Sequence, residues 1–262
     1  MTEASQAKSS ISELPPEADD HAVAAALATA AGRRLMEIRT QIGFADAAAL
    51  RSAGDQGAQD LLAEQLARLR PEDSVLSEEA RDDPARLEAS RVWIIDPLDG
   101  TREFSEAGRT DWAVHVALWV KGELVAGAVA LPGREITLCT PDVTAPQPDP
   151  ARRLRLVVSR TRPPAEAHQV AASLDAELVP LGSAGAKVSA VILGEADAYV
   201  HGGGQYEWDS AAPVTVAVAA GLHASRLDGS ALVYNRPDPY LPDLLVCRPE
   251  LAKPVLDSMS AD

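Results

Sequence analysis

The sequence predicts an α/β fold, and three observations support it. A proline-free, alanine-rich stretch that begins at Asp19 indicates a long first helix, a hairpin pattern occupies the middle of the chain, and strand-like and helix-like runs alternate after residue 150. Such alternation is typical of helices layered on sheets. The 262 residues suffice for one large domain or two small ones.

The first half of the chain reads as two helices followed by several strands. Asp19 and Asp20 open the first helix, where their charges suit the helix dipole. A polar gap at 52–57 precedes a second helix at 58–70, in which leucines 61, 62, 66 and 69 share one stripe. The strand-like runs are 74–76, 91–95, 112–120, 123–131 and 134–140. The pair Lys121-Gly122 predicts a hairpin turn between the third and fourth runs.

A proline-rich segment at 141–150 divides the sequence. Its composition forbids a regular element and suits an exposed linker. The elements expected after it are strands or helices at 154–158, 165–174, 176–180, 184–193, 198–201 and 210–220. We therefore expect a flexible tail at 1–18, an N-terminal α+β subdomain at 19–145 and a C-terminal α/β subdomain at 146–262.

Charge and cysteine content limit which partners the protein can bind and which cellular compartment it suits. The formal net charge of −15 argues against a nucleic-acid polymer or an anionic membrane, since both favour a basic patch. A small anionic substrate would need a cation as mediator. The two cysteines, Cys139 and Cys247, lack metal-ligand spacing and suit a reducing compartment. No signal peptide is evident and the apolar runs are too short to span a membrane, so a cytoplasmic location is expected.

The strongest chemical signal is WIIDPLDGT at 93–101. An apolar strand delivers Asp96 to its end, and Asp99 follows three residues later. A tight turn would bring both carboxylates and the Leu98 carbonyl together, and clustered oxygen ligands are what Mg²⁺ prefers. Gly100 and Thr101 would then present backbone N–H groups to a phosphate. The alternative is an ordinary β-turn, because Asp-Pro and Asp-Gly are common turn pairs.

Two further acidic positions strengthen the metal interpretation. Glu78 and Glu79 follow an apolar strand, although alone they would read as a solvated loop. Asp209 precedes an apolar helix, where alone it would read as an N-cap. Together with Asp96 and Asp99, these positions supply enough carboxylates for two or three Mg²⁺ ions shared with a substrate phosphate.

These motifs resemble those of the inositol monophosphatase-like superfamily of Mg²⁺-dependent, lithium-sensitive phosphatases. The matching segments are SEE at 77–79, WIIDPLDGT at 93–101 and WDSAA at 208–212, in the order and spacing of that family. The resemblance covers residues 19–222 and is greatest to CysQ-type 3′(2′),5′-bisphosphate nucleotidases of actinobacterial type. It implies a layered αβαβα phosphatase fold in two subdomains that meet at the metal site.

The resemblance also assigns roles to individual residues. The metal ligands it implies are Glu78, Asp96, Asp99 and Asp209, with the Leu98 carbonyl. The attacking water is expected to be oriented by Thr101 and by an aspartate after the first helix, for which Asp55 is the candidate. Here the chain departs from the family pattern, because the usual threonine is missing and the spacing is altered. Asp60, the other nearby aspartate, is expected to be structural.

Two later segments resemble the nucleotide-binding parts of bisphosphate nucleotidases. The first, VVSRTR at 157–162, contributes Ser159 and Arg160. The second, GSAGAK at 182–187, contributes Ser183 and Lys187. Arg160 and Lys187 are expected to contact the second phosphate, since a guanidinium fits phosphate geometry; the alternative for each is a solvated surface charge.

The loop before Asp209 disfavours inositol as the substrate. Inositol monophosphatases typically carry a glutamate seven residues before this aspartate, whereas position 202 is glycine. The loop at 201–205 therefore looks open, with room for a base. His201, in the same loop, reads as a surface histidine.

The resemblance implies hydrolysis of 3′-phosphoadenosine 5′-phosphate to AMP and phosphate, and action on 3′-phosphoadenylyl sulfate, in sulfate assimilation. A homodimer is expected by analogy with the family. The alternative within enzymes is inositol monophosphatase or fructose-1,6-bisphosphatase activity at the same site. The alternative from another class is a non-catalytic sensor that binds metal or nucleotide.

Overall fold

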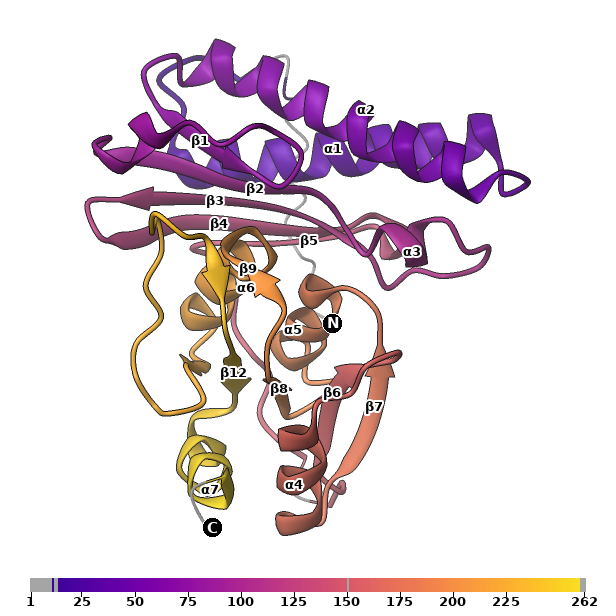
Figure 1. The fold of residues 1–262 in the computed structure, drawn as a ribbon, viewed down its shortest axis with the longest axis vertical. Coiled ribbons are helices and arrows are strands. Elements are labelled where there is room, and N and C mark those ends of the chain that lie inside the picture. Colours follow the sequence, from indigo (N-terminus) through magenta and orange to yellow (C-terminus); the bar gives the residue numbers. More distant parts are fainter. Residues whose placement is uncertain (1–10, 12–13, 150, 260–262) are drawn as a thin grey trace.

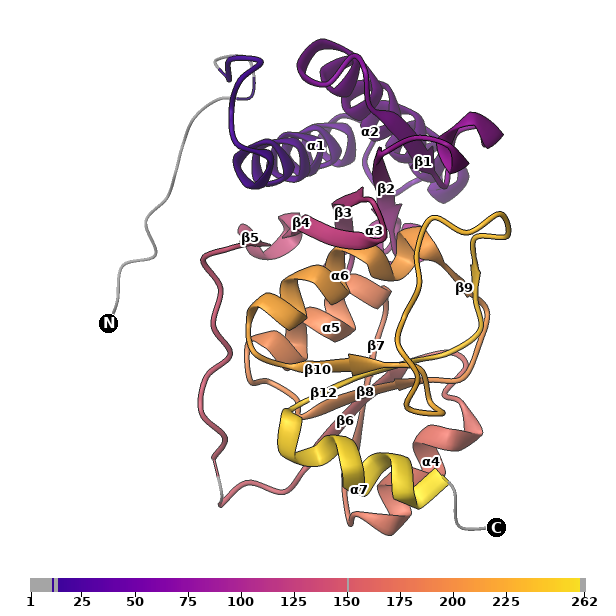
Figure 2. The ribbon, with the colours of Figure 1, turned by 90° about the vertical axis from the view of Figure 1, so that its left-hand side faces the viewer.

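The computed structural model describes residues 11, 14–149 and 151–259. In this part of the chain, helices and sheets alternate in five layers (Figure 1). The helices of the outer layer are α1 (Asp20–Ile42) and α2 (Ala47–Leu69), which cover the first sheet. The helices of the middle layer are α5 (Ala184–Ile192) and α6 (Glu207–Ala219). The helices beyond the second sheet are α4 (Ala165–Ser173) and α7 (Pro249–Met259) (Figure 2). The predicted αβαβα layering is confirmed.

The first sheet has the order β1-β2-β3-β4-β5. Its strands are β1 (Ser74–Ser77), β2 (Arg91–Asp99), β3 (Ala113–Val120), β4 (Glu123–Leu131) and β5 (Ile136–Cys139). The β1–β2 pair is parallel and the other pairs are antiparallel. Along β2, Trp93 and Ile95 pack toward α1 and α2, while Val92 and Ile94 pack toward the middle helices. Burial on both faces explains why residues 92–95 form an unbroken apolar run.

The second sheet has the order β10-β12-β8-β6-β7. Its strands are β10 (His223–Ser225), β12 (Leu244–Cys247), β8 (Ala198–His201), β6 (Arg155–Ser159) and β7 (Glu177–Leu181). A separate short pair joins β9 (Gln205–Tyr206) to β11 (Tyr240–Leu241). Single helical turns are α3 (Thr101–Phe104), η2 (Pro84–Leu87) and η3 (Pro132–Arg134).

Helix α2 corrects one sequence expectation. The polar gap predicted at 52–57 is wrong, because this stretch lies inside a continuous helix that starts eleven residues before position 58. The two glycines in it are required by close packing. A Cβ on Gly54 would lie 2.7 Å from Phe104 Cε1, and one on Gly57 would lie 2.5 Å from Ile38 Cδ1. The glycines thus mark close contacts of a helix and not its end.

Strand β2 also extends further than expected, through Pro97 to Asp99. Asp96 pairs with His115 and Asp99 pairs with Ala113, so three steps along β2 match two along β3. This irregularity accommodates a proline, which has no N–H to donate to the ladder. It also turns the end of the strand so that both aspartates reach the same place.

Most other predicted elements are confirmed. These include the first helix, the hairpin formed by β3 and β4, and the alternation of strands and helices after residue 150. The helix expected from residue 210 begins three residues earlier, at Glu207. The sequence analysis missed α3, α7 and strands β9 to β12, which are short or weakly patterned.

The structure tests the predictions about the N-terminal tail, the linker and the subdomain boundary only in part. Residues 141–149 hold no helix or strand, in agreement with the expected break. The flexible tail expected at 1–18 falls largely on residues outside the described part of the chain; the described carbonyls of Pro16 and Ala18 accept hydrogen bonds from Arg70. The two-subdomain boundary at residue 145 stays a prediction. In the described ranges, no helix has the length and apolar character needed to cross a membrane.

The packing of α2 makes one prediction about stability. Leu62 is fully buried against α1 and β2, whereas Leu61 is only partly buried. We expect Leu62→Ala to lower the free energy of unfolding by about 2–5 kcal/mol, because it leaves a cavity. The matched control Leu61→Ala should cost about 1 kcal/mol. Denaturant titration would measure both, and equal losses would contradict this orientation of the helix.

Candidate metal and phosphate site

Three aspartates meet where β2 ends and α6 begins. Asp96 and Asp99 come from the irregular end of β2, and Asp209 comes from the first turn of α6, which packs across the same sheet. One carboxylate oxygen from each lies within 4.8 Å of the others. Asp209 is the third residue of the helix and not its N-cap, but it still caps the helix: its carboxylate accepts a hydrogen bond from Tyr206 N at 2.7 Å as part of a capping box.

Asp99 is held on one side by polar groups. Its Oδ2 accepts hydrogen bonds from Ser183 Oγ at 2.5 Å and from Gly185 N at 2.7 Å. His115 Nε2 lies 3.2 Å from the same oxygen, while its Nδ1 lies 3.0 Å from the Trp208 carbonyl oxygen. The contacts with Asp99 all involve Oδ2, so the fixed carboxylate can offer Oδ1 to a cation. Sequence reasoning missed His115, which stands alone in an apolar strand and carries no spacing signal.

Burial and charge separate the pKa values of these carboxylates. Burial, and then the charge of Asp99, raise the pKa of Asp209 to about 7. Burial, and then the charges of Glu78 and Asp99, raise the pKa of Asp96 well above its ordinary value. Although burial also acts on Asp99, its hydrogen bonds with His115 and Ser183 hold its pKa at about 2. The cluster therefore retains protons near neutral pH unless a cation balances its charge.

Glu78 joins the cluster from the loop after β1. Burial and the charge of Asp209 raise its pKa to about 7, and its carboxyl interacts with that of Asp96. The structure therefore brings together all four carboxylates that the sequence assigned to the metal. Glu78 is exposed, as the solvated-loop alternative expected, and its raised pKa shows that it also interacts with the neighbouring carboxylates.

A buried network connects the loop that carries Glu78 to the start of α6. Arg86 is 1% exposed and donates from Nη1 to Asn235 Oδ1 at 2.7 Å. Glu207 in turn accepts hydrogen bonds from the backbone N–H groups of Asn235 and Arg236 at 2.7 and 2.8 Å. Since Glu207 lies two residues before Asp209, this network links η2 to the turn of α6 that carries Asp209.

The donor set fits Mg²⁺. Asp96 Oδ2 is buried and has no hydrogen-bond partner in the described residues, which leaves it suited to a cation. Carboxylate and carbonyl oxygens are the ligands that Mg²⁺ takes in proteins. The Leu98 carbonyl accepts a hydrogen bond from Thr101 Oγ1 at 3.3 Å, which places the predicted carbonyl ligand beside the predicted orienting hydroxyl.

The turn after Asp99 requires glycine. Gly100 has φ +88°, and a Cβ there would lie 3.0 Å from Ser183 Cβ. The β-turn alternative describes this segment incompletely, because the turn at Gly100 leads directly into α3, which starts at Thr101. The resulting turn places the backbone of Gly100 and Thr101 at the edge of a pocket.

Asp55 lies in the interior of α2, not in a loop. Burial, and then the charge of Glu79, raise its pKa to about 6. Its neighbour Gly54 packs against Leu98, so this turn of the helix faces the acidic cluster. Asp60 points elsewhere: it is exposed and accepts a hydrogen bond from Gln56 on the same helix.

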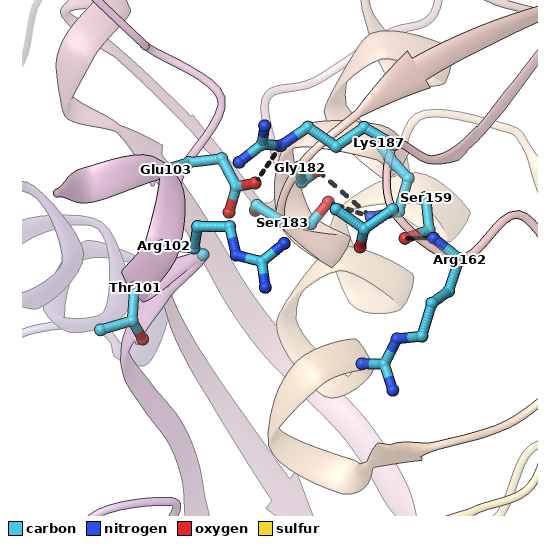
Figure 3. Close-up of a pocket in the computed structure, with 11 residues that line it drawn as sticks. Thr101, Arg102, Glu103, Ser159, Arg162, Gly182, Ser183 and Lys187 are labelled. Atoms are coloured by element: carbon cyan, nitrogen blue, oxygen red, sulfur yellow. Dashed lines mark hydrogen bonds and ion pairs between the residues drawn. The ribbon is translucent and has the colours of Figure 1, made fainter. Parts of the chain in front are cut away.

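A pocket of about 440 Å³ opens beside the cluster (Figure 3). Its walls contain all six residues predicted to bind substrate: Gly100, Thr101, Ser159, Arg160, Ser183 and Lys187. They come from α3, the end of β6 and the start of α5. Residues that the sequence analysis did not select also line it, namely Arg102, Glu103, Thr161, Arg162 and Gly182.

Two predicted phosphate ligands already have partners. Arg160 donates to Glu103 Oε1 and to Glu106 Oε1, each at 2.6 Å. Lys187 is 5% exposed and donates from Nζ to the carbonyls of Gly182 and Ser183 at 3.2 and 2.7 Å. The surface-charge alternative is therefore wrong for Lys187, whereas Arg160 is a partly exposed, ion-paired side chain. Their side chains shape the pocket wall.

The loop at 201–205 differs from the open loop that was expected. A Cβ on Gly202 would lie 2.5 Å from Glu166 Oε2, so the space above this glycine is filled by a carboxylate. His201 is half-buried and not a surface residue; burial, and then the charge of Lys187, lower its pKa to about 4. The sequence could not show this, because Lys187 and Glu166 lie on other elements.

Solved structures share this fold. The inositol monophosphatase II structure from Staphylococcus aureus superposes with a TM-score of 0.75 at 19% identity, covering 90% of this chain and 89% of that chain. The sequence profile of the inositol monophosphatase family matches residues 17–258. The fold and the acidic site thus define the class, and the chain belongs to the inositol monophosphatase family.

Curated relatives are more similar in sequence. The chain is 55% identical over 255 residues to a protein of Mycobacterium leprae named 3′-phosphoadenosine 5′-phosphate phosphatase, covering 92% of this chain and 93% of the relative. It is 32% identical over 204 residues to the 3′(2′),5′-bisphosphate nucleotidase CysQ of Salmonella typhimurium, covering 72% and 81%.

The cluster predicts how metal affects stability. We expect Mg²⁺ to raise the melting temperature of the wild type by several degrees, and Asp209→Asn to remove most of that gain, because one ligand is lost. In EDTA near pH 8 the variant should be at least as stable as the wild type, since one repelling charge is gone. Differential scanning fluorimetry would measure both effects.

The pH dependence gives a second check. Because the pKa of Asp209 is raised to about 7 in the folded chain, the native state holds a proton that the unfolded state has released. The stability of the metal-free wild type should therefore fall as pH rises from about 4 to about 7. The fall should be smaller in Asp209→Asn and unchanged in the exposed control Asp142→Asn. A steeper fall in Asp209→Asn would count against the acidic cluster.

Proposed function

We propose that this protein is a Mg²⁺-dependent phosphatase that hydrolyses 3′-phosphoadenosine 5′-phosphate to AMP and phosphate. The observation that carries the proposal is the 55% identity, over 92% of the chain, to a protein named for that activity. The acidic cluster beside a cation-lined pocket supports it chemically. The same site would convert 3′-phosphoadenylyl sulfate to adenylyl sulfate, which places the enzyme in sulfate assimilation.

The ligands proposed for two or three Mg²⁺ ions are Glu78, Asp96, Asp99, Asp209 and the Leu98 carbonyl. When bound, Mg²⁺ would act as a Lewis acid that draws charge from the phosphate oxygens. The protein contributes rigidity: the hydrogen bonds that Ser183 and Gly185 donate to Asp99 fix one carboxylate before substrate arrives. A preorganised site loses less free energy to rearrangement during the reaction.

The proposed roles in proton transfer belong to Asp55 and Thr101. Asp55, with its pKa raised to about 6, is ionised at neutral pH and basic enough to accept a proton from the attacking water. The Thr101 hydroxyl, which donates to the Leu98 carbonyl, would orient that water. The N–H groups of Gly100 and Thr101 would bind the phosphate as it is displaced.

The nucleotide is proposed to occupy the pocket formed by Ser159, Arg160, Ser183 and Lys187. Its overall positive lining suits a second phosphate, which inositol 1-phosphate lacks. We also propose a cytoplasmic location, because the two cysteines suit a reducing compartment, and a homodimeric state, by analogy with the family.

A phosphate-release assay tests the substrate. With Mg²⁺ present, we expect kcat/KM for 3′-phosphoadenosine 5′-phosphate to exceed that for inositol 1-phosphate and fructose 1,6-bisphosphate at least tenfold, about 1.4 kcal/mol of transition-state preference. A preference for inositol or fructose phosphate would replace the proposed substrate while leaving the family intact. Absence of any turnover would favour the non-catalytic sensor.

Replacement of Asp55 tests the proposed base. Asp55→Asn should lower kcat by roughly 10²- to 10⁴-fold and leave Mg²⁺ binding, measured by calorimetry, nearly unchanged. The wild-type kcat should also decrease as pH falls below about 6, because only the ionised carboxylate accepts a proton. Asp60→Asn, on the next turn of the same helix, is the matched control and should keep wild-type kcat. Equal effects of the two substitutions would contradict the role of Asp55.

A further inference from the structure

Four cationic side chains line the pocket beside the acidic cluster: Arg102, Arg160, Arg162 and Lys187. A substrate with two phosphates needs cations for the phosphate that is not cleaved. Which of the four can supply them depends on the hydrogen bonds that each one already makes.

The Lys187 ammonium group has little capacity left. Of its three N–H donors, two are used by the carbonyls of Gly182 and Ser183, and the ammonium lies 5.3 Å from the centre of the Tyr199 ring. The side chain is 5% exposed. Ser183 adopts φ +46°, a conformation rare for residues with a Cβ. By binding its carbonyl, Lys187 stabilises the turn from which Ser183 donates to Asp99.

Arg160 is likewise committed. Its Nε and Nη2 atoms contact the carboxylates of Glu103 and Glu106 at 2.6 Å. Because Glu103 is 6% exposed, removal of Arg160 would leave a buried carboxylate without its counter-ion beside the phosphate pocket. The arginine is therefore placed to neutralise the wall of the pocket, and its charge is largely cancelled for an incoming anion.

Arg102 and Arg162 differ from both. Each is exposed, and within the described residues neither guanidinium makes a hydrogen bond or an ion pair. Arg102 is in α3 directly after Thr101, and Arg162 follows β6 on the other wall. Both residues line the same pocket, and in Figure 3 they lie on opposite sides of it: Arg102 extends toward Ser183, while Arg162 extends away from Ser159.

We propose that Arg102 and Arg162 bind the non-scissile phosphate of the substrate from two sides, while Arg160 and Lys187 are positioning residues that make no direct contact with it. This inference rests on the proposed function and names its specificity-determining residues. Guanidinium groups bind phosphate oxygens in pairs of charge-assisted hydrogen bonds. With the scissile phosphate at Gly100 and Thr101, the adjacent Arg102 is the first free cation that the rest of the substrate would meet.

The test compares two nucleotides that share the scissile group. 3′-Phosphoadenosine 5′-phosphate carries both phosphates and 3′-AMP carries only the one that is cleaved. In Arg102→Gln and Arg162→Gln, kcat/KM for the bisphosphate should fall roughly 10- to 100-fold, the effect of a lost hydrogen bond to a charged group. The value for 3′-AMP should change less than about threefold.

Two further variants separate binding from structure. Arg160→Gln should lower kcat/KM for both nucleotides by a similar factor, because it disturbs the wall and not one contact. Arg33→Gln removes an exposed arginine from α1 and should affect neither substrate.

A second measurement is inhibition of 3′-AMP hydrolysis. Arg102→Gln and Arg162→Gln should weaken inhibition by 5′-AMP about tenfold and leave inhibition by inorganic phosphate unchanged.

The outcomes distinguish this inference from the proposed function. Absence of turnover of both nucleotides by the wild type would overturn the proposed function, whereas equal kcat/KM for the bisphosphate and 3′-AMP would overturn this inference and leave the proposed hydrolysis standing. A wild-type preference that persists in Arg102→Gln and Arg162→Gln would overturn this inference alone. Selective loss of the bisphosphate in Arg160→Gln would also overturn it and return that arginine to the role first expected from the sequence.

Discussion

The repulsion among buried carboxylates is the constraint on which the rest of the site depends. Asp96, Asp99 and Asp209 place oxygens within 4.8 Å of one another, an arrangement that opposes folding unless protons or cations balance it. The surrounding residues stabilise the charge of some of these carboxylates much more than that of others. Hydrogen bonds from Ser183 and the proximity of His115 keep Asp99 ionised, while burial raises the pKa of its neighbours. A site that is unfavourable when empty is one that a divalent cation stabilises strongly.

The same principle extends into the pocket, where an acidic protein must hold an anion. Glu103 neutralises Arg160, and backbone carbonyls hold Lys187, so these two cations support the walls. The guanidinium groups of Arg102 and Arg162, which make no hydrogen bond or ion pair within the described residues, line the same pocket. A net charge of −15 is therefore compatible with an anionic substrate, because local cations and a bound metal set the field at the site and distant surface charges are screened.

Regular patterns along the chain predicted most of the fold. The first helix, the hairpin and the alternation after residue 150 depend on local periodicity, which the sequence displays directly. The failures have a common cause. Gly54 and Gly57 read as a break in a helix because their packing partners are far away in sequence, and Pro97 read as the end of a strand because the irregularity that accommodates it depends on β3.

The sequence by itself determined which carboxylates to assign to the metal, since the motifs around Glu78, Asp96 and Asp209 occur together in the order and spacing of one family. What only the tertiary structure decided is how the other side chains are used. His115 and Arg102 had no signal because their roles depend on neighbours brought in from other elements. Arg160 looked free for phosphate because the carboxylates that bind it lie more than fifty positions earlier in the chain. The type of a side chain can be read from the sequence, but whether it is free to bind a ligand depends on the groups that folding places beside it.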